Sequence, residues 1–354
     1  MKVNLKEKKQ MKKIKLMSLF SGIGAFEKGM KDKGIDYELI NYCEIDKYAS
    51  YAYSVMHEVD ENLNLGDVSK VDTSNIKEFD LLTYGFPCQD ISLAGNMKGI
   101  IKGETRSGLL FEALRIIKDK KPRFAIAENV RNLVSKKFIN DFNNMLKELD
   151  EFGYNSYWQI LNSKNYGVAQ SRERVFVVSI RKDIDNGNFK FPEKNSNLIP
   201  LKSILEDNVN ERFYVNNSYV KDFIKDLNNK LIDNKKPNVF GLIKVGEIKN
   251  PKTLDMNKRV FSTNGVSPTI TTNSDSIPKI VECKIRKLTP KECWLAQGFS
   301  ENDYIKVKQE LENKFYNGGD RATTQLYKMA GNSISVPVAG AIIENLIKQV
   351  NFKE

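Results

Sequence analysis

A cysteine follows a buried strand in the segment DLLTYGFPCQDIS, residues 80–92. The apolar run over residues 78–84 predicts the strand, and Gly85 and Pro87 predict a stiff turn directly before Cys88. A thiol presented on such a turn is a candidate nucleophile, whereas a cysteine that only packs is expected inside a strand. An isolated Pro-Cys pair is equally compatible with an inert, partly buried thiol, so the interpretation needs support from other motifs.

Three further charged groups stand at the ends of predicted strands. Glu128 lies in the strand RFAIAENV, and Arg172 and Arg174 lie in QSRERVFVV, which leads into another apolar run. Because the carboxyl ends of parallel strands face one crevice, Glu128 is expected to share a site with Cys88. A carboxyl group there can have a raised pKa and act as an acid, and arginine forks suit phosphate or carbonyl oxygens. Taken singly, these residues also fit an ordinary salt bridge and a solvated charge cluster.

A glycine-containing turn predicts a cofactor site. Gly22 and Gly24 in FSGIGAFE separate the first strand from a helix, where the backbone can approach a ligand. Glu44 ends the next strand about 20 residues later, the place where an acidic residue binds ribose hydroxyls. Glu27 stands where a dinucleotide-binding loop needs a small residue, and it would repel a pyrophosphate. The pattern therefore favours S-adenosylmethionine over NAD.

Strands and helices alternate along the first half of the chain, which predicts an α/β fold with a doubly wound, mostly parallel sheet. Strands are expected at residues 14–20, 37–45, 78–84, 123–130, 156–162 and 174–181. From about Asp183 to Glu282 the chain is rich in Asn, Lys and Ser, which predicts a separate, smaller unit or a large insertion. Helical patterning returns at Thr289-Pro290, a favourable helix start.

The composition narrows the class of protein. The chain has 354 residues, a net charge of +11, four cysteines and one histidine, His57. Without Cys-x-x-Cys pairs, zinc fingers and a disulfide framework are excluded, and His57 is interpreted as a structural residue. Residues 1–13 are interpreted as a flexible basic tail, and the basic balance favours a nucleic-acid partner. No membrane span or signal peptide is recognisable, which predicts a cytoplasmic protein.

The motifs in this order resemble those of the bacterial C5-cytosine-specific DNA methyltransferases of restriction-modification systems, over nearly the whole chain. FSGIGAFE is similar to the family's first motif, GFPCQDIS to its nucleophile motif, ENV to its glutamate motif and QSRERVFVV to its arginine motif. RKLTPKECWLAQGF and GNSISVPVAGAI resemble the last two blocks. The resemblance implies a Rossmann-like methyltransferase fold with a catalytic domain at residues 14–183 and 284–354. It also implies a target-recognition domain at residues 184–283.

The resemblance implies methyl transfer from S-adenosylmethionine to carbon 5 of a flipped-out cytosine in double-stranded DNA, through a covalent bond from Cys88 to carbon 6. The implied catalytic residues are Cys88, Glu128, Arg172 and Arg174. The implied cofactor-binding residues are Phe20, Gly22, Gly24, Glu44, Ile45, Asp67, Pro87, Leu109, Asn332 and Ser333. The implied DNA-binding residues are Gln89, Ser92, Arg106 and Thr269. No metal is expected, and Gly95 and Gly99 are expected to act as hinges of a closing loop.

Three other functions remain open at this point. A cytosine RNA methyltransferase would use the same chemistry, a non-catalytic relative would only bind DNA, and an NAD-dependent oxidoreductase would share the sheet. Intact Cys88, Glu128 and Arg174 argue against the second, and Glu27 argues against the third. The resemblance implies a monomer. A separate restriction endonuclease as partner and an orphan or phage enzyme are both compatible with it.

Overall fold

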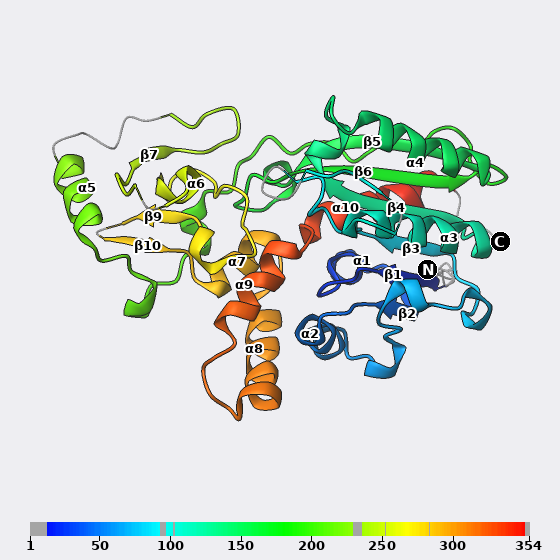
Figure 1. Ribbon diagram of the computed structural model, residues 1–354, viewed down its shortest axis with the longest axis horizontal. Coiled ribbons are helices and arrows are strands. Elements are labelled where there is room, and N and C mark those ends of the chain that lie inside the picture. Colours follow the sequence, from blue (N-terminus) through cyan, green and yellow to red (C-terminus); the bar gives the residue numbers. More distant parts are fainter. Residues whose placement is uncertain are drawn as a thin grey trace, which may run out of the picture.

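Two β-sheets organise the computed structural model, which describes residues 13–92, 97–101, 103–228, 236–251, 253–282 and 284–350. The larger sheet has six strands in the order β2-β1-β3-β4-β6-β5, and the smaller sheet has four in the order β10-β9-β8-β7. Figure 1 shows the two sheets at opposite ends of the long axis, with helices α7 and α9 between them. The described part of the chain has no helix long and apolar enough to cross a membrane.

Four strands of the larger sheet are parallel, as the alternation of strands and helices predicts. They are β1 (Ile14–Leu19), β2 (Tyr37–Cys43), β3 (Leu81–Tyr84) and β4 (Phe124–Val130). The sixth strand, β6 (Glu173–Arg181), runs antiparallel to both β4 and β5 (Tyr154–Asn162). Only ten residues separate β5 from β6 (residues 163–172), too few for the helical crossover that a parallel neighbour needs. This reversal brings the start of β6 to the edge where β4 ends.

Helices cover both faces of the larger sheet. Helices α1 (Ala25–Asp32) and α10 (Val336–Gln349) share one buried cluster with the sheet, and α3 (Leu110–Lys120) and α4 (Ile139–Glu151) share another. A Cβ atom at Gly29 would lie 2.6 Å from the Gly340 nitrogen, so α1 and α10 pack backbone to backbone. A third buried cluster contains residues of α2 (Lys47–His57), α7 (Pro290–Gln297), α8 (Glu301–Tyr316) and α9 (Thr323–Asn332). The larger sheet and the helices on its two faces thus form a three-layer sandwich, and the carboxyl ends of its parallel strands face the second sheet.

The smaller sheet lies in the region of changed composition and the residues just after it. Its strands are β7 (Lys244–Glu247), β8 (Arg259–Ser262), β9 (Lys279–Val281) and β10 (Ile285–Lys287), accompanied by α5 (Ser218–Asn228) and α6 (Asp255–Lys258). Val220, Ile248, Val260 and Ile285 form its small apolar core. Such a small core stabilises little by itself, so the unit depends on its junction with the rest of the chain.

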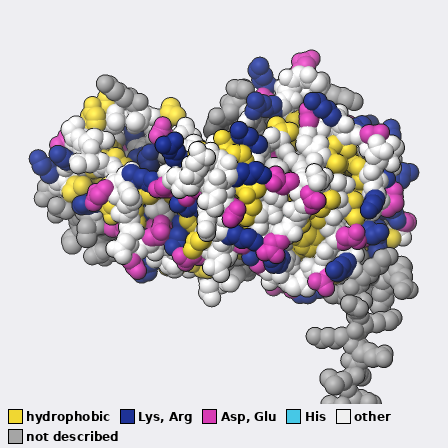
Figure 2. Space-filling view, turned by 90° about the horizontal axis from the view of Figure 1, so that it is seen from below, with side chains coloured by type: hydrophobic (Ala, Val, Ile, Leu, Met, Phe, Trp, Pro, Cys, Tyr) yellow, Lys and Arg dark blue, Asp and Glu magenta, His cyan; other side chains and the backbone are white. Residues whose placement is uncertain are grey.

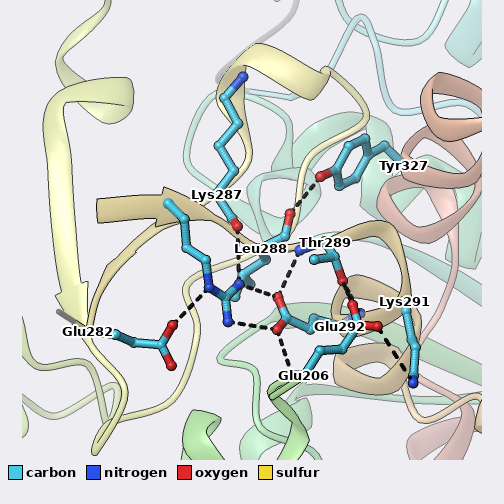
Figure 3. Close-up of polar contacts among 9 residues, drawn as sticks. Glu206, Glu282, Lys287, Leu288, Thr289, Lys291, Glu292 and Tyr327 are labelled. Carbon is cyan, nitrogen blue, oxygen red and sulfur yellow. Dashed lines mark hydrogen bonds and ion pairs between the residues drawn. The ribbon is translucent and has the colours of Figure 1, made fainter. Parts of the chain in front are cut away.

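A buried ion pair joins the smaller sheet to α7 (Figure 3). Arg286 on β10 donates to both carboxylate oxygens of Glu292 at 2.8 and 2.9 Å, and its Nε donates to Glu282 at 2.8 Å. Glu292 also accepts the backbone N–H groups of Thr289 at 2.7 Å and Glu206 at 3.0 Å, and the Thr289 hydroxyl caps α7 in a capping box. Because both buried charges are fully hydrogen-bonded, the pair fixes β10 against α7.

Replacing Arg286 by lysine is expected to lower the free energy of unfolding by about 2 kcal/mol, because a single ammonium group cannot reproduce the bidentate contact with Glu292 and also reach Glu282. Urea unfolding of the purified variant measures this loss. Lys284→Ala is the matched control, since Lys284 pairs with Glu211 at 3.5 Å on the surface and should change nothing measurable. Equal stability of the Arg286→Lys and Lys284→Ala variants would show that the bidentate geometry contributes nothing.

Candidate active site

Cys88, Glu128 and Arg174 meet at one edge of the larger sheet. Cys88 follows β3, Glu128 lies near the end of β4, and the register pairs Val130 at the end of β4 with Arg174 on the reversed strand β6. The Arg174 Nε atom lies 3.0 Å from Glu128 Oε1, and the two side chains are only 16% and 10% exposed. Because β6 is antiparallel to β4, it places Arg174 beside the carboxyl ends of the parallel strands, where Cys88 and Glu128 lie.

The turn that carries Cys88 is held by polar contacts that sequence reasoning missed. The Asn129 side chain donates to the Phe86 carbonyl at 3.0 Å, and the Ser107 hydroxyl donates to the Pro87 carbonyl at 2.8 Å. The Cys88 carbonyl accepts the N–H groups of Ile91 at 3.0 Å and Ser92 at 2.7 Å. The asparagine directly after Glu128 was the available signal, because a buried amide next to a functional carboxyl needs its own partner.

Burial disfavours the ionised forms of both Cys88 and Glu128. It raises the pKa of the Cys88 thiol, and the nearby Glu128 carboxylate raises it further, while Arg174 and Arg172 lower it. Burial also raises the pKa of Glu128, against the lowering effect of Arg174 and Arg172. At neutral pH the free site therefore contains a neutral thiol, and the two groups titrate in response to each other.

Arg172 lies in this site but points at the protein backbone. Its guanidinium donates to the carbonyl oxygens of Ile270 at 3.3 Å, Gly331 at 3.0 Å and Ser333 at 2.8 Å. Burial lowers the pKa of this guanidinium, the three carbonyls accept from its Nη atoms, and its buried Nε has no hydrogen-bond partner among the described residues. Arg172 thus ties the start of β6 to the segment around Ile270 and to the loop after α9. The Thr269 hydroxyl belongs to the same network and donates to the Ser171 carbonyl at 3.0 Å.

The glycine turn and Glu44 form a second group at the same edge of the sheet. Phe20, Gly22 and Gly24 have positive φ angles of 55°, 55° and 75°, a conformation that non-glycine residues rarely adopt. The Gly22 N–H donates to one Glu44 carboxylate oxygen at 2.9 Å, and the Asp46 N–H donates to the other at 2.8 Å. A Cβ atom at Gly22 would meet nothing within 4 Å, so the turn leaves open space beside the carboxylate.

The side chains around this group fit an adenosine-containing cofactor. Ile45 is 77% exposed, which is unusual for a large apolar side chain and offers a surface for an aromatic base. Glu44 is an acceptor for ribose hydroxyls, and burial raises its pKa while the N–H groups of Asp46 and Gly22 lower it. Asp67 caps a short helical turn through the Ser69 N–H at 3.0 Å and the Ser69 hydroxyl at 2.8 Å.

The remaining predicted cofactor residues border the Cys88 turn and the loop after α9. Leu109 packs against the core beside α3, and the Pro87 carbonyl is engaged by Ser107. Asn332 ends α9 with an exposed side chain, and the buried Ser333 gives its carbonyl to Arg172. These contacts connect the predicted cofactor-binding residues with the turn that carries Cys88.

The predicted DNA-binding residues Gln89 and Arg106 close the loop that follows Cys88. Both side chains are exposed, and Arg106 donates to the Gln89 side-chain oxygen at 2.8 Å, which joins the two ends of the loop. Inside the loop, Gly99 has a φ angle of 89°, and its Cβ would lie 3.2 Å from the Asp141 carboxylate. Gly95, the other expected hinge, lies outside the described residues.

Known proteins are similar to this chain over most of its length. The C-5 cytosine-specific DNA methylase family matches residues 14–348. The chain is 31% identical to the orphan methyltransferase M.SPRI of Bacillus phage SPR, covering 97% of this chain and 100% of the phage protein. It is 30% identical to the type II methyltransferase M.HhaI of Haemophilus parahaemolyticus, covering 98% of each chain.

A solved structure shares the fold. The Entamoeba histolytica methyltransferase EhMeth superposes with a TM-score of 0.68 at 17% identity, covering 97% of this chain and 100% of that one. The overall fold therefore agrees with the methyltransferase fold that the sequence motifs imply. The chain belongs to the C-5 cytosine-specific DNA methylase family.

Proposed function

We propose that the protein transfers a methyl group from S-adenosylmethionine to carbon 5 of a cytosine flipped out of double-stranded DNA. The observation that carries the proposal is the meeting of Cys88, Glu128 and Arg174 at one sheet edge, with the Glu128–Arg174 ion pair at 3.0 Å. Membership of the family and the net charge of +11 support DNA as the substrate.

The chain's residues divide the chemistry between them. The Cys88 thiolate adds to carbon 6 of the base, and Glu128 donates a proton to ring nitrogen 3, so that no negative charge accumulates on the ring. Arg174 holds the Glu128 carboxyl and donates to the base carbonyl. When bound, S-adenosylmethionine supplies the electrophilic methyl group. Return of the nitrogen 3 proton to Glu128, loss of the carbon 5 proton to a base and expulsion of the Cys88 thiolate then restore the aromatic ring.

The glycine turn and Glu44 hold the cofactor in this proposal. Glu44 accepts hydrogen bonds from the ribose hydroxyls, Phe20 and Ile45 lie against the adenine, and Asp67 accepts from its amino group. Leu109, Pro87, Asn332 and Ser333 border the same site. The open space at Gly22 and the exposure of Ile45 support this placement.

DNA is held between the two sheets in this proposal. Residues 14–183 and 284–354 form the catalytic domain, and residues 184–283 form the target-recognition domain, whose small sheet is completed by β10 from the catalytic part. Gln89, Ser92, Arg106 and Thr269 lie along the path of the DNA. Figure 2 shows lysine and arginine side chains over the whole face, interspersed with acidic ones, so attraction to DNA comes from distributed charge there. The protein acts as a monomer in the cytoplasm, beside a separate restriction endonuclease or as an orphan enzyme.

A base-resolution map of 5-methylcytosine tests the proposal. The protein is expressed in a host without cytosine methylation, and the genome is sequenced beside that of a host expressing the Cys88→Ala variant. Methylation at one short DNA motif, absent with the variant, is the expected result. Soluble protein with no methylated DNA would overturn the proposal, and methylated RNA in the same cells would assign the chemistry to an RNA substrate.

A further inference from the structure

The single histidine of the chain lies beneath the glycine turn. His57 Nε2 is 3.1 Å from the Ile23 carbonyl oxygen. Because a carbonyl oxygen only accepts, Nε2 carries the proton and donates it. A Cβ atom at Gly24 would lie 2.2 Å from His57 Nε2, so the imidazole fills the space under the turn. His57 ends α2 and lies outside the sequence segments that resemble the family motifs.

Hydrogen bonds hold the glycine turn on two sides. On the side facing the open space, the Gly22 N–H donates to Glu44, and on the inner side the Ile23 carbonyl accepts from His57. Among the described residues, the other hydrogen bonds of the turn include the Ser21 N–H to the Cys43 carbonyl at 3.1 Å, the Gly24 N–H to the Ser21 carbonyl at 2.9 Å and the Lys28 N–H to the Gly24 carbonyl at 3.0 Å. Two glycines in the left-handed region have many alternative conformations, so the turn keeps its shape only while these contacts hold.

A buried Tyr53–Glu27 pair holds the histidine in place. The Tyr53 and His57 rings lie 4.6 Å apart between centroids, and the Tyr53 hydroxyl donates to Glu27 Oε1 at 2.9 Å. Glu27 is 1% exposed, and its second oxygen has no hydrogen-bond partner in the described part of the chain. Tyr53 also stacks on Tyr42 of β2 with ring centroids 4.1 Å apart. The imidazole therefore rests on a packed aromatic layer and cannot rotate away freely.

We propose that His57 is a positioning residue for the cofactor. Its Nε2–H holds the Ile23 carbonyl, and its ring supports Gly24. The turn consequently keeps the shape in which the Gly22 amide meets Glu44 and leaves room for the ligand. This inference rests on the proposed use of the turn for S-adenosylmethionine. It assigns to the sole histidine a role in cofactor affinity, with no part in proton transfer at Cys88.

Two isosteric variants isolate the hydrogen bond. Glutamine carries its amide nitrogen at the same number of bonds from Cβ as histidine Nε2, whereas asparagine places it where Nδ1 stands. His57→Ala and His57→Asn are expected to raise the Kd for S-adenosylmethionine by about tenfold, the loss of one buried hydrogen bond. His57→Gln should stay within about threefold of the wild type on the same scale. In steady-state assays the loss should fall on KM for the cofactor and leave kcat at saturation nearly unaffected.

Tyr51→Phe is the matched structural control. Tyr51 lies on the same helix as His57, and the change removes the hydrogen bond from its hydroxyl to Glu310 at 3.3 Å while leaving His57 and the turn untouched, so its effect should fall on Tm and not on the Kd. Calorimetric titration of the full-length proteins with S-adenosylmethionine measures affinity, and thermal unfolding measures stability.

The outcomes separate this inference from the proposed function. Wild-type protein that fails to bind S-adenosylmethionine overturns both. Wild-type binding with equal affinity in His57→Asn and His57→Gln overturns the inference alone. Should the alanine variant fail to fold, the comparison of asparagine with glutamine still decides.

Discussion

Replacing Cys88 by alanine is expected to lower kcat by roughly 10⁴-fold or more, since removal of a covalent nucleophile leaves only binding and positioning to act on the base. Carbon 5 of cytosine is a weak nucleophile until a group adds to carbon 6, and Cys88 is the thiol that the turn after β3 presents at the sheet edge. Affinity for S-adenosylmethionine should change little, because the glycine turn and Glu44 do not contact this side chain in the described structure.

The variant is tested with tritiated cofactor and with DNA that carries 5-fluorocytosine, whose carbon 5 has no proton to release. Wild-type protein should form a denaturation-resistant adduct with this DNA, and the Cys88→Ala variant should not. Cys293→Ala is the matched control, because that thiol is buried in the core and should be dispensable for the adduct. Methyl transfer by Cys88→Ala above about 1% of the wild-type rate would exclude covalent catalysis through this residue.

Glu128→Gln is expected to lower kcat/KM by about 10²–10³-fold, because an amide cannot deliver a proton to ring nitrogen 3. The amide occupies the same volume and can still meet Arg174 with its oxygen, so the fold should survive. Burial is what makes the wild-type group suitable, since it raises the pKa of Glu128 towards the working range.

The pH dependence provides the sharper test. The productive state contains the Cys88 thiolate and protonated Glu128, and burial raises the pKa of both groups above their ordinary values. Below the pKa of Glu128, this carboxyl group is fully protonated and the fraction of Cys88 present as thiolate falls as the pH falls. Above the pKa of Cys88, the thiol is fully ionised and the fraction of protonated Glu128 falls as the pH rises. Wild-type kcat/KM should therefore be bell-shaped, with a plateau between the two values.

The pH profile of kcat/KM for the Glu128→Gln variant should not be bell-shaped. Since glutamine does not titrate, its kcat/KM should rise continuously with pH through the raised pKa of Cys88. Initial rates in constant-ionic-strength buffers from about pH 6 to 10 measure both profiles. Arg131→Lys is a suitable control, because Arg131 pairs with Glu173 on the surface near the site. A bell-shaped profile retained by Glu128→Gln would assign the acid role to another group.

Several elements were predictable because their signals are local. Alternating apolar runs predicted the strands of the larger sheet, and Thr289-Pro290 predicted the start of α7, which the capping box confirms. The glycine turn, Glu44 and the Pro-Cys segment were recognisable for the same reason, because turns and helix caps depend on residues close together in the chain. The order of these motifs was sufficient to indicate the family.

The direction of β6 was not readable from its apolar residues. A buried strand has the same composition whichever way it runs. The pairing of Val130 with Arg174 shows that β6 is antiparallel to β4, so the arginine-bearing start of β6 lies at the end of β4. The sequence likewise could not show what Arg172 contacts, because its guanidinium binds three backbone carbonyls from two distant segments.

Residue types and their near neighbours were enough to predict the chemistry, because the thiol, the carboxyl and the glycine turn are each recognisable from a short segment. The residues that support this chemistry became visible only in the folded chain. His57 reaches Ile23 across 34 positions of the chain, and Arg172 reaches the Ser333 carbonyl across 161. Both contacts are made between elements brought together by packing, and no pattern of neighbouring residues encodes a partner at that distance.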